Sequence, residues 1–172
     1  MDYDQLDKEL MKILEFLSIT ETPTQEWLKG AMLVCLEYES ALKSEPVLSE
    51  FQYWSHQIAN VKVALAFQLQ DWRLIEDTCQ RVLDDLLAAA VLDDLSYIHF
   101  LVGLAAALYA QQRVSEVEVQ IVRYASLLSV KKIKHGIRLS ENLSYALHEP
   151  GRLHFLDHLK KALRDKIEQE QA

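Results

Sequence analysis

The sequence contains few residues that interrupt helices. Only four of its 172 residues are glycine and three are proline, a composition that disfavours turn-rich β folds and favours long helices. Cysteine is equally scarce. Cys35 and Cys79 both lie in apolar runs, and no Cys-x-x-Cys motif is present. We therefore predict two reduced core residues rather than a disulfide or a metal clip.

Membrane-spanning and targeting signals are missing as well. No apolar run approaches the roughly 18 residues that are needed to cross a bilayer. The sequence opens with Met-Asp-Tyr-Asp, which is acidic where a secretory signal is basic. We expect a cytoplasmic protein that does not insert into a membrane.

Motifs for catalysis and cofactor binding are also lacking. There is no glycine-rich phosphate loop, nucleophile elbow or Cys-His arrangement, and the neighbours Asp84-Asp85 and Asp93-Asp94 point in different directions on a helix. His154 and His158 share a helix face, but a zinc site needs three or four converging ligands. We predict no catalytic residue, no cofactor and no structural metal, and hence no enzyme.

Half of the residues are apolar, and they recur at steps of three and four along most of the chain. This spacing is typical of amphipathic helices. A chain of this length buries about 70% of its unfolded surface in one core, and no linker divides the sequence. We predict an all-α single domain over residues 1–172, an antiparallel array of about seven or eight helices in hairpins.

An internal match organises the middle of the chain. When Trp72 is set equivalent to Val114, the apolar positions before and after these two residues coincide. The polar breaks that directly precede them, Gln70-Asp71 and Gln111-Gln112-Arg113, coincide as well. The pattern predicts two helix–turn–helix units 42 residues apart, the plan of a helical solenoid. The alternative is a chance alignment of two amphipathic hairpins. The matched pairs are Ala59/Leu101, Val63/Ala105, Phe67/Tyr109, Ile75/Val117, Cys79/Ile121 and Val82/Tyr124.

These hairpins resemble the tetratricopeptide repeat. The segment from Ala66 to Trp72, Ala-Phe-Gln-Leu-Gln-Asp-Trp, resembles the turn and following aromatic residue of that family. Gly103-Leu-Ala-Ala106 is similar to a run in the bacterial type III secretion chaperones that carry translocator proteins. The spacing of 42 residues exceeds the family period of about 34. The resemblance implies a non-enzymatic adaptor or chaperone that holds a peptide or helix of a partner protein.

The same resemblance implies where a partner binds. In tetratricopeptide proteins the first helix of each hairpin lines a concave groove, and here these helices are residues 57–69 and 97–111. Side-chain amides can pair with an extended backbone, and aromatic rings offer apolar surface. Phe67 and Tyr109 have an alternative place in the core, because they lie on apolar stripes. The implied groove residues are Gln57, Asn60, Ala64, Phe67, Gln68, His99, Val102, Ala106, Tyr109 and Arg113.

Charge is spread unevenly. The chain carries a net charge of −8, with −7 in residues 1–50 and +3 in residues 101–172. An acidic chain is a poor candidate for nucleic-acid binding. The one basic cluster could meet nucleic acid, anionic lipid or an acidic partner, and an acidic protein fits best. Alternatively, four of its five groups lie in the last turns of a helix that stops at Gly136, where cations favour the helix dipole. The cluster is Lys131, Lys132, Lys134, His135 and Arg138.

Two further functions remain as alternatives. The chain can be a structural subunit of a homo- or hetero-oligomeric assembly, or a small helical enzyme or metal protein. Gly103 lies in the middle of a predicted helix, where glycine lowers stability unless a backbone or ligand must come close. We interpret it as a site of tight helix packing or, alternatively, of ligand contact.

Overall fold

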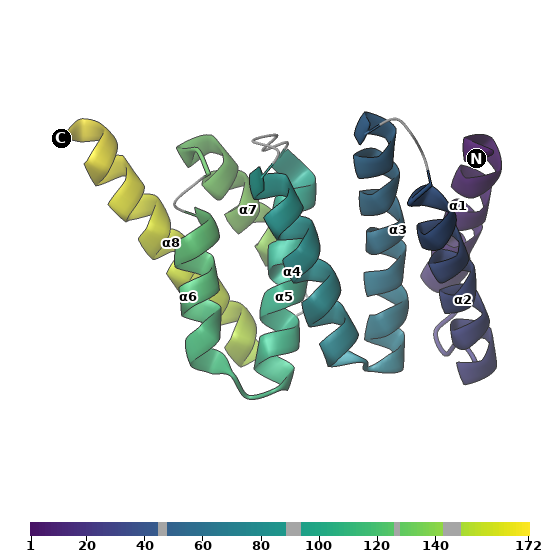
Figure 1. Ribbon diagram of the computed structural model, residues 1–172. Helices are drawn as coiled ribbons and strands as arrows, with labels where there is room; N and C mark the ends of the chain where they lie inside the picture. The colour runs from purple at the N-terminus through teal and green to yellow at the C-terminus, as the bar shows by residue number, and fades with distance from the viewer. Residues whose placement is uncertain (45–47, 89–93, 126–127, 143–148) are drawn as a thin grey trace. The chain divides into compact units, whose positions relative to one another are not determined.

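The computed structural model describes residues 1–44, 48–88, 94–125, 128–142 and 149–172. Over these residues the chain folds into eight α-helices without a strand, so the predicted all-α helical array is confirmed (Figure 1). The helices are α1 (Tyr3–Ile19), α2 (Gln25–Leu42), α3 (Leu48–Leu69), α4 (Trp72–Ala88), α5 (Asp94–Ala110), α6 (Val114–Ala125), α7 (Val130–Asn142) and α8 (Glu149–Gln171). Among the described helices, none is long and apolar enough to cross a bilayer.

The chain divides into two compact units, residues 1–78 and 79–172. Their border falls inside α4 and not in a linker. A continuous helix carries no change of composition at such a border. This explains why no division is visible in the sequence.

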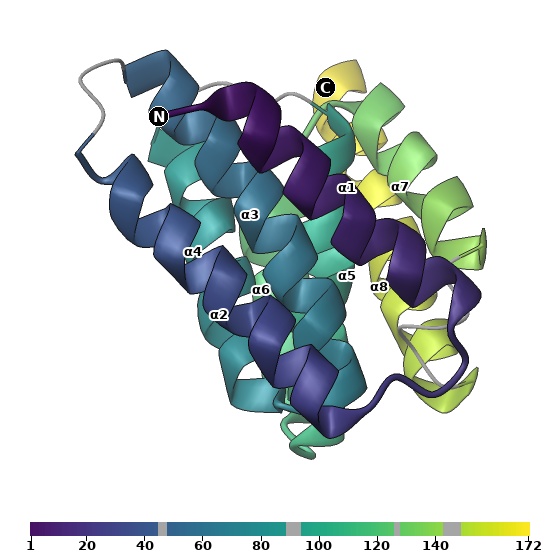
Figure 2. The ribbon, with the colours of Figure 1, turned by 90° about the vertical axis from the view of Figure 1, so that its right-hand side faces the viewer.

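In the first unit, α1 and α2 both pack against α3 (Figure 2). Leu6 of α1, Leu28 of α2 and Ile58 of α3 are almost fully buried. An ion pair also joins α2 to α3, with Lys62 Nζ 2.9 Å from Glu39 Oε2. Lys62 is buried and Glu39 is half-buried, so their attraction offsets part of the solvation that each charge loses.

In the second unit, α5 packs against α6, α7 and α8. Its described residues from Tyr97 to Leu108 are buried, apart from the half-buried His99. A helix that is apolar on all sides is stable only when it is covered on all sides. The second half of α4 is held to α6 through Asp84, which accepts hydrogen bonds from Tyr124 Oη at 3.0 Å and Arg123 Nη2 at 3.2 Å.

The prediction that a helix stops at Gly136 is wrong. Gly136 lies inside α7, and a Cβ atom there would be 2.5 Å from Ile98 Cδ1 of α5. The glycine is needed because two helices approach closely, not because a helix ends. The helix expected before it divides instead into α6 and α7. The sequence also predicts a short helix over residues 140–148, most of which lie outside the described residues.

The two polar breaks of the internal match have the same backbone geometry. Gln70 and Gln112 have positive φ angles of 55° and 60°. The next amide in each turn donates to a carbonyl five residues back, Asp71 to Ala66 at 3.0 Å and Arg113 to Leu108 at 2.9 Å. Together with the bonds from Gln70 and Gln112 to the carbonyls three residues back, this is the Schellman ending of a helix. The predicted helix–turn–helix pairs are thus present at both places.

Both cysteines are free and buried, as predicted. Cys35 lies on α2 in the first unit and Cys79 on α4 in the second. Burial raises the pKa of the Cys35 thiol to about 12. It also raises the pKa of Cys79. Both side chains therefore serve as small apolar core residues.

Candidate partner-binding site

The groove residues implied on α3 lie in the first unit and are half-buried or exposed. Gln57 and Asn60 are half-buried, and Gln68 is exposed. Phe67 is half-buried and contacts Trp72 edge to face, with ring centroids 5.8 Å apart. The half-buried Ala64 lies on the same helix. These side chains are partly accessible, and Phe67 also contributes to the α3–α4 turn.

The groove residues implied on α5 are more deeply covered. Val102 and Ala106 are 1% and 4% exposed, so they pack inside the second unit. His99 is half-buried, and burial lowers its pKa. Arg113 lies between α5 and α6 and pairs with Glu116 through two bonds, Nε to Oε1 at 2.7 Å and Nη2 to Oε2 at 2.6 Å.

Tyr109 is held by α8. A Cβ atom at Gly151 would be 3.1 Å from the Tyr109 ring, and the Tyr109 hydroxyl is hydrogen-bonded to His154 Nδ1. Burial raises the Tyr109 pKa, so the hydroxyl stays protonated. The α3 and α5 residues belong to different units, and one groove shared by both helices remains a prediction.

The two histidines of α8 bond to groups within the protein. His154 Nε2 is 3.1 Å from His158 Nε2, and His158 Nδ1 is 3.6 Å from Glu118 Oε1. Lys161 Nζ lies 3.8 Å from the same carboxylate oxygen. Across the described residues, no three His, Cys, Asp or Glu side chains converge as metal ligands do.

Two members of the basic cluster lie at the opposite end of a helix from the one expected. Because α7 begins at Val130, Lys131 and Lys132 occupy its first turn, and the interpretation as dipole-favoured cations in a last turn is wrong. The amino end of a helix carries partial positive charge. Each cation there is therefore unfavourable, by about 0.3–1 kcal/mol in an exposed position.

The start of α7 is fixed by Ser129. The Ser129 hydroxyl accepts the Lys132 amide at 3.3 Å, and its carbonyl accepts the Ile133 amide at 3.0 Å. Leu128 and Ile133, which flank the first turn, are fully buried. A polar cap between two such apolar residues is the hydrophobic staple of a helix start. This signal is present in the sequence, and it marks the break between α6 and α7.

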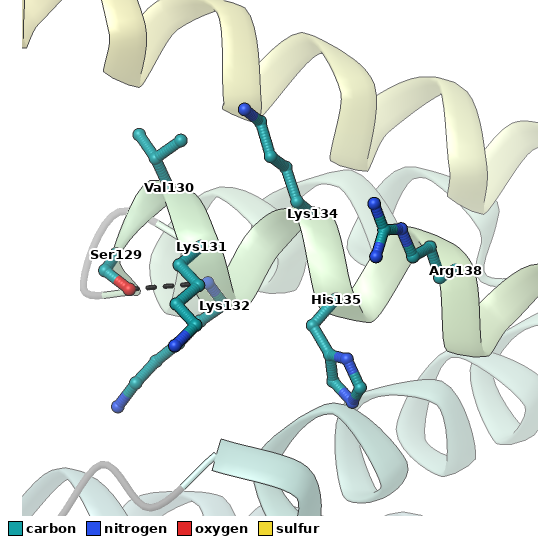
Figure 3. Close-up of a pocket in the computed structure, with 7 residues that line it drawn as sticks. All are labelled: Ser129, Val130, Lys131, Lys132, Lys134, His135 and Arg138. Carbon is teal, nitrogen blue, oxygen red and sulfur yellow. Dashed lines mark hydrogen bonds between the residues drawn. The ribbon is translucent and has the colours of Figure 1, made fainter.

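The basic cluster lines a cavity of about 700 Å³ at the surface of α7. Figure 3 shows Val130, Lys134 and Arg138 along one side of the helix, and Lys131 and His135 along another. Lys131, Lys134, His135 and Arg138 are exposed, and Lys132 is half-buried. No acidic residue is among the described lining residues, which are Ser129, Val130, Lys131, Lys132, Lys134, His135 and Arg138. We call this set the α7 basic surface.

The chain matches no protein-family model, no curated protein and no solved structure. No relative therefore supplies a function or a site. The α7 basic surface is the candidate that geometry and charge support best, because it combines a cavity with charge of one sign.

Proposed function

We propose that the protein is a non-enzymatic binding module, an adaptor or chaperone, whose α7 basic surface holds an acidic segment of a partner protein. The observation that carries this proposal is the place of the cations. Lys131 and Lys132 lie in the first turn of α7, where the helix dipole opposes them. An anionic partner relieves this repulsion and gains the attraction of the exposed Lys134 and Arg138.

The electrostatics favour a protein partner over a nucleic acid. The whole chain carries a net charge of −8, which disfavours the approach of a long polyanion. The helix is 13 residues long, or about 20 Å, which suits a short acidic segment.

A binding assay tests the proposal. The probe is a short fluorescein-labelled peptide of alternating glutamate and alanine. Its binding is measured by fluorescence anisotropy at low ionic strength. We expect saturable binding that weakens as salt is added, because screening acts on exposed charges. The double variant Lys134→Glu/Arg138→Glu should bind at least roughly tenfold more weakly, about 1.4 kcal/mol.

A matched variant separates this site from overall charge. Lys160→Glu/Arg164→Glu reverses two exposed cations on α8 that are not among the described lining residues of the cavity. It should retain binding within about twofold, a difference near the size expected for a remote surface charge. Equal losses in both kinds of variant would show that net charge alone governs binding and would reject the α7 basic surface as a site.

The charge asymmetry of the chain favours a second candidate function, a self-assembling structural subunit. Residues 1–50 carry −7 and residues 101–172 carry +3, so the acidic region of one copy is complementary to the α7 basic surface of another. Sedimentation velocity at low salt distinguishes this candidate. A mass that rises with concentration, and that Lys134→Glu/Arg138→Glu returns to the monomer, supports self-assembly over capture of a different protein.

A further inference from the structure

A groove of about 440 Å³ runs between the second half of α1 and the first half of α2, in the first unit. Figure 2 shows these two helices beside each other against α3. The groove is lined mainly by apolar groups, with Glu9 and Lys12 as its charged members. Its other lining residues are Ile13, Phe16, Trp27, Gly30, Ala31 and Val34.

Gly30 leaves an open place in this groove. A Cβ atom built there has no neighbour within 4 Å, and the residue is exposed. This contrasts with Gly136, where a Cβ would collide with Ile98. Glycine inside a helix lowers its stability relative to alanine, and no packing contact among the described residues requires Gly30. The space is therefore available to an entering group.

The walls of the groove favour a helical occupant. Both walls are α-helices, whose interior backbone groups are bonded within the helix. An extended segment would lose water from its own N–H and C=O groups without finding partners. A helix satisfies these groups internally and needs only an apolar face. Phe16 and Trp27, stacked with centroids 4.0 Å apart, form a broad aromatic surface of the kind that dominates binding energy.

The surrounding charge favours a basic occupant. Glu9 is among the lining residues, and Glu15 and Glu26 are exposed on the two helices that form the groove. Residues 1–50 carry a net charge of −7, so lysine or arginine on the flanks of an entering helix meets complementary charge. We infer that the α1–α2 groove is a docking site for a basic amphipathic helix of a partner protein, with Gly30 as the place where one of its apolar side chains enters.

A synthetic peptide tests this inference independently of the α7 basic surface. The probe is a fluorescein-labelled amphipathic helix with leucine on one face and lysine on the other, and the comparison peptide has glutamate in place of lysine. Gly30→Leu fills the open place and should weaken binding of the lysine peptide at least roughly tenfold. Ser40→Leu, an exposed α2 position outside the groove, is the matched control and should retain full binding.

Two further measurements make the result decisive. Gly30→Leu should not lower the urea midpoint of the full chain, because leucine is a better helix former than glycine and the place is open. The indole N–H resonance of Trp27 should shift when the lysine peptide binds to the wild-type chain. The inference is overturned if Gly30→Leu binds as tightly as wild type, if the glutamate peptide binds equally well, or if the Trp27 resonance does not move.

Discussion

Tyr109 of α5 and His154 of α8 meet edge to face, with ring centroids 5.5 Å apart, and the Tyr109 hydroxyl is hydrogen-bonded to His154 Nδ1. Because burial keeps Tyr109 protonated, the hydroxyl can donate and Nδ1 can accept. Nε2–H of His154 is then directed to Nε2 of His158, and Nδ1–H of His158 to Glu118. This order of donors suits a neutral imidazole at His154.

Acid should therefore weaken the second unit. Burial, followed by the charge of His158, lowers the pKa of His154 below its ordinary value of 6.5. The unfolded chain then binds more protons than the folded chain as pH falls through that ordinary value, so the free energy of unfolding declines. Urea titrations at neutral and mildly acidic pH should show a smaller decline in His154→Gln than in wild type.

A second histidine variant serves as the control for this pH effect. His135 is exposed on α7, and His135→Gln should retain the wild-type decline. An identical pH dependence in His154→Gln and wild type would mean that the contacts of His154 do not contribute to acid sensitivity. The remaining decline in His154→Gln is expected from His99, whose pKa burial also lowers.

Glycine at either turn should stabilise the chain. Gln70 and Gln112 have positive φ angles, a conformation that costs a residue with a side chain about 1–2 kcal/mol. Gln70→Gly and Gln112→Gly should each raise the free energy of unfolding by about 1 kcal/mol, measured by urea denaturation. Gln52→Gly, inside α3, should lower it by a similar amount. A loss of stability at both turns would contradict the helix endings described.

Two tyrosines in the second unit should respond in opposite ways to loss of the hydroxyl. Tyr97 is fully buried, and its hydroxyl has no hydrogen-bond partner among the described residues. Tyr97→Phe removes this uncompensated group and should raise the free energy of unfolding by about 1 kcal/mol. Tyr124→Phe breaks the bond to Asp84 and should lower it by about 1–2 kcal/mol. Equal losses in both variants would show that Tyr97 has a partner.

Removing one charge of the Lys62–Glu39 ion pair should destabilise the first unit more than replacing both charges. Lys62→Met removes the cation that contacts Glu39 at 2.9 Å, and the free energy of unfolding should fall by about 1.5–3 kcal/mol, the range for a hydrogen bond between charged groups. The double variant Lys62→Met/Glu39→Leu replaces both charges and should recover most of that loss. Thermal and urea denaturation measure both effects, and a double variant weaker than Lys62→Met would contradict this account.

Local pattern was enough to predict the helices and the repeated turn. Steps of three and four on both sides of Trp72 and Val114 carry that information within short windows. The start of α7 was missed because the apolar stripe continues through Tyr124, Leu128 and Ile133. The role of Gly136 is not visible in the sequence, because the glycine leaves room for Ile98, which lies far away along the chain. A glycine signals a helix stop or a close contact, and only tertiary structure separates the two.

For the candidate sites, too, the sequence shows which residues are present, whereas their role depends on tertiary structure. The basic residues of α7 are visible in the sequence, but their significance depends on which end of a helix they occupy. Gly30 is equally visible, yet whether it packs or opens a groove depends on the distance between α1 and α2. For Val102 and Ala106, the resemblance implied a groove, whereas their burial depends on the helices that cover α5.

Each unit carries one buried thiol, Cys35 in the first and Cys79 in the second. A thiol reagent at neutral pH can modify such a group only while the helices around it are transiently open. The alkylation rate of each cysteine therefore reports how often its unit opens. Peptide mass spectrometry of the alkylated chain can measure both rates in one sample, without an added label. Unequal modification rates would show that the two halves of the chain open independently of each other.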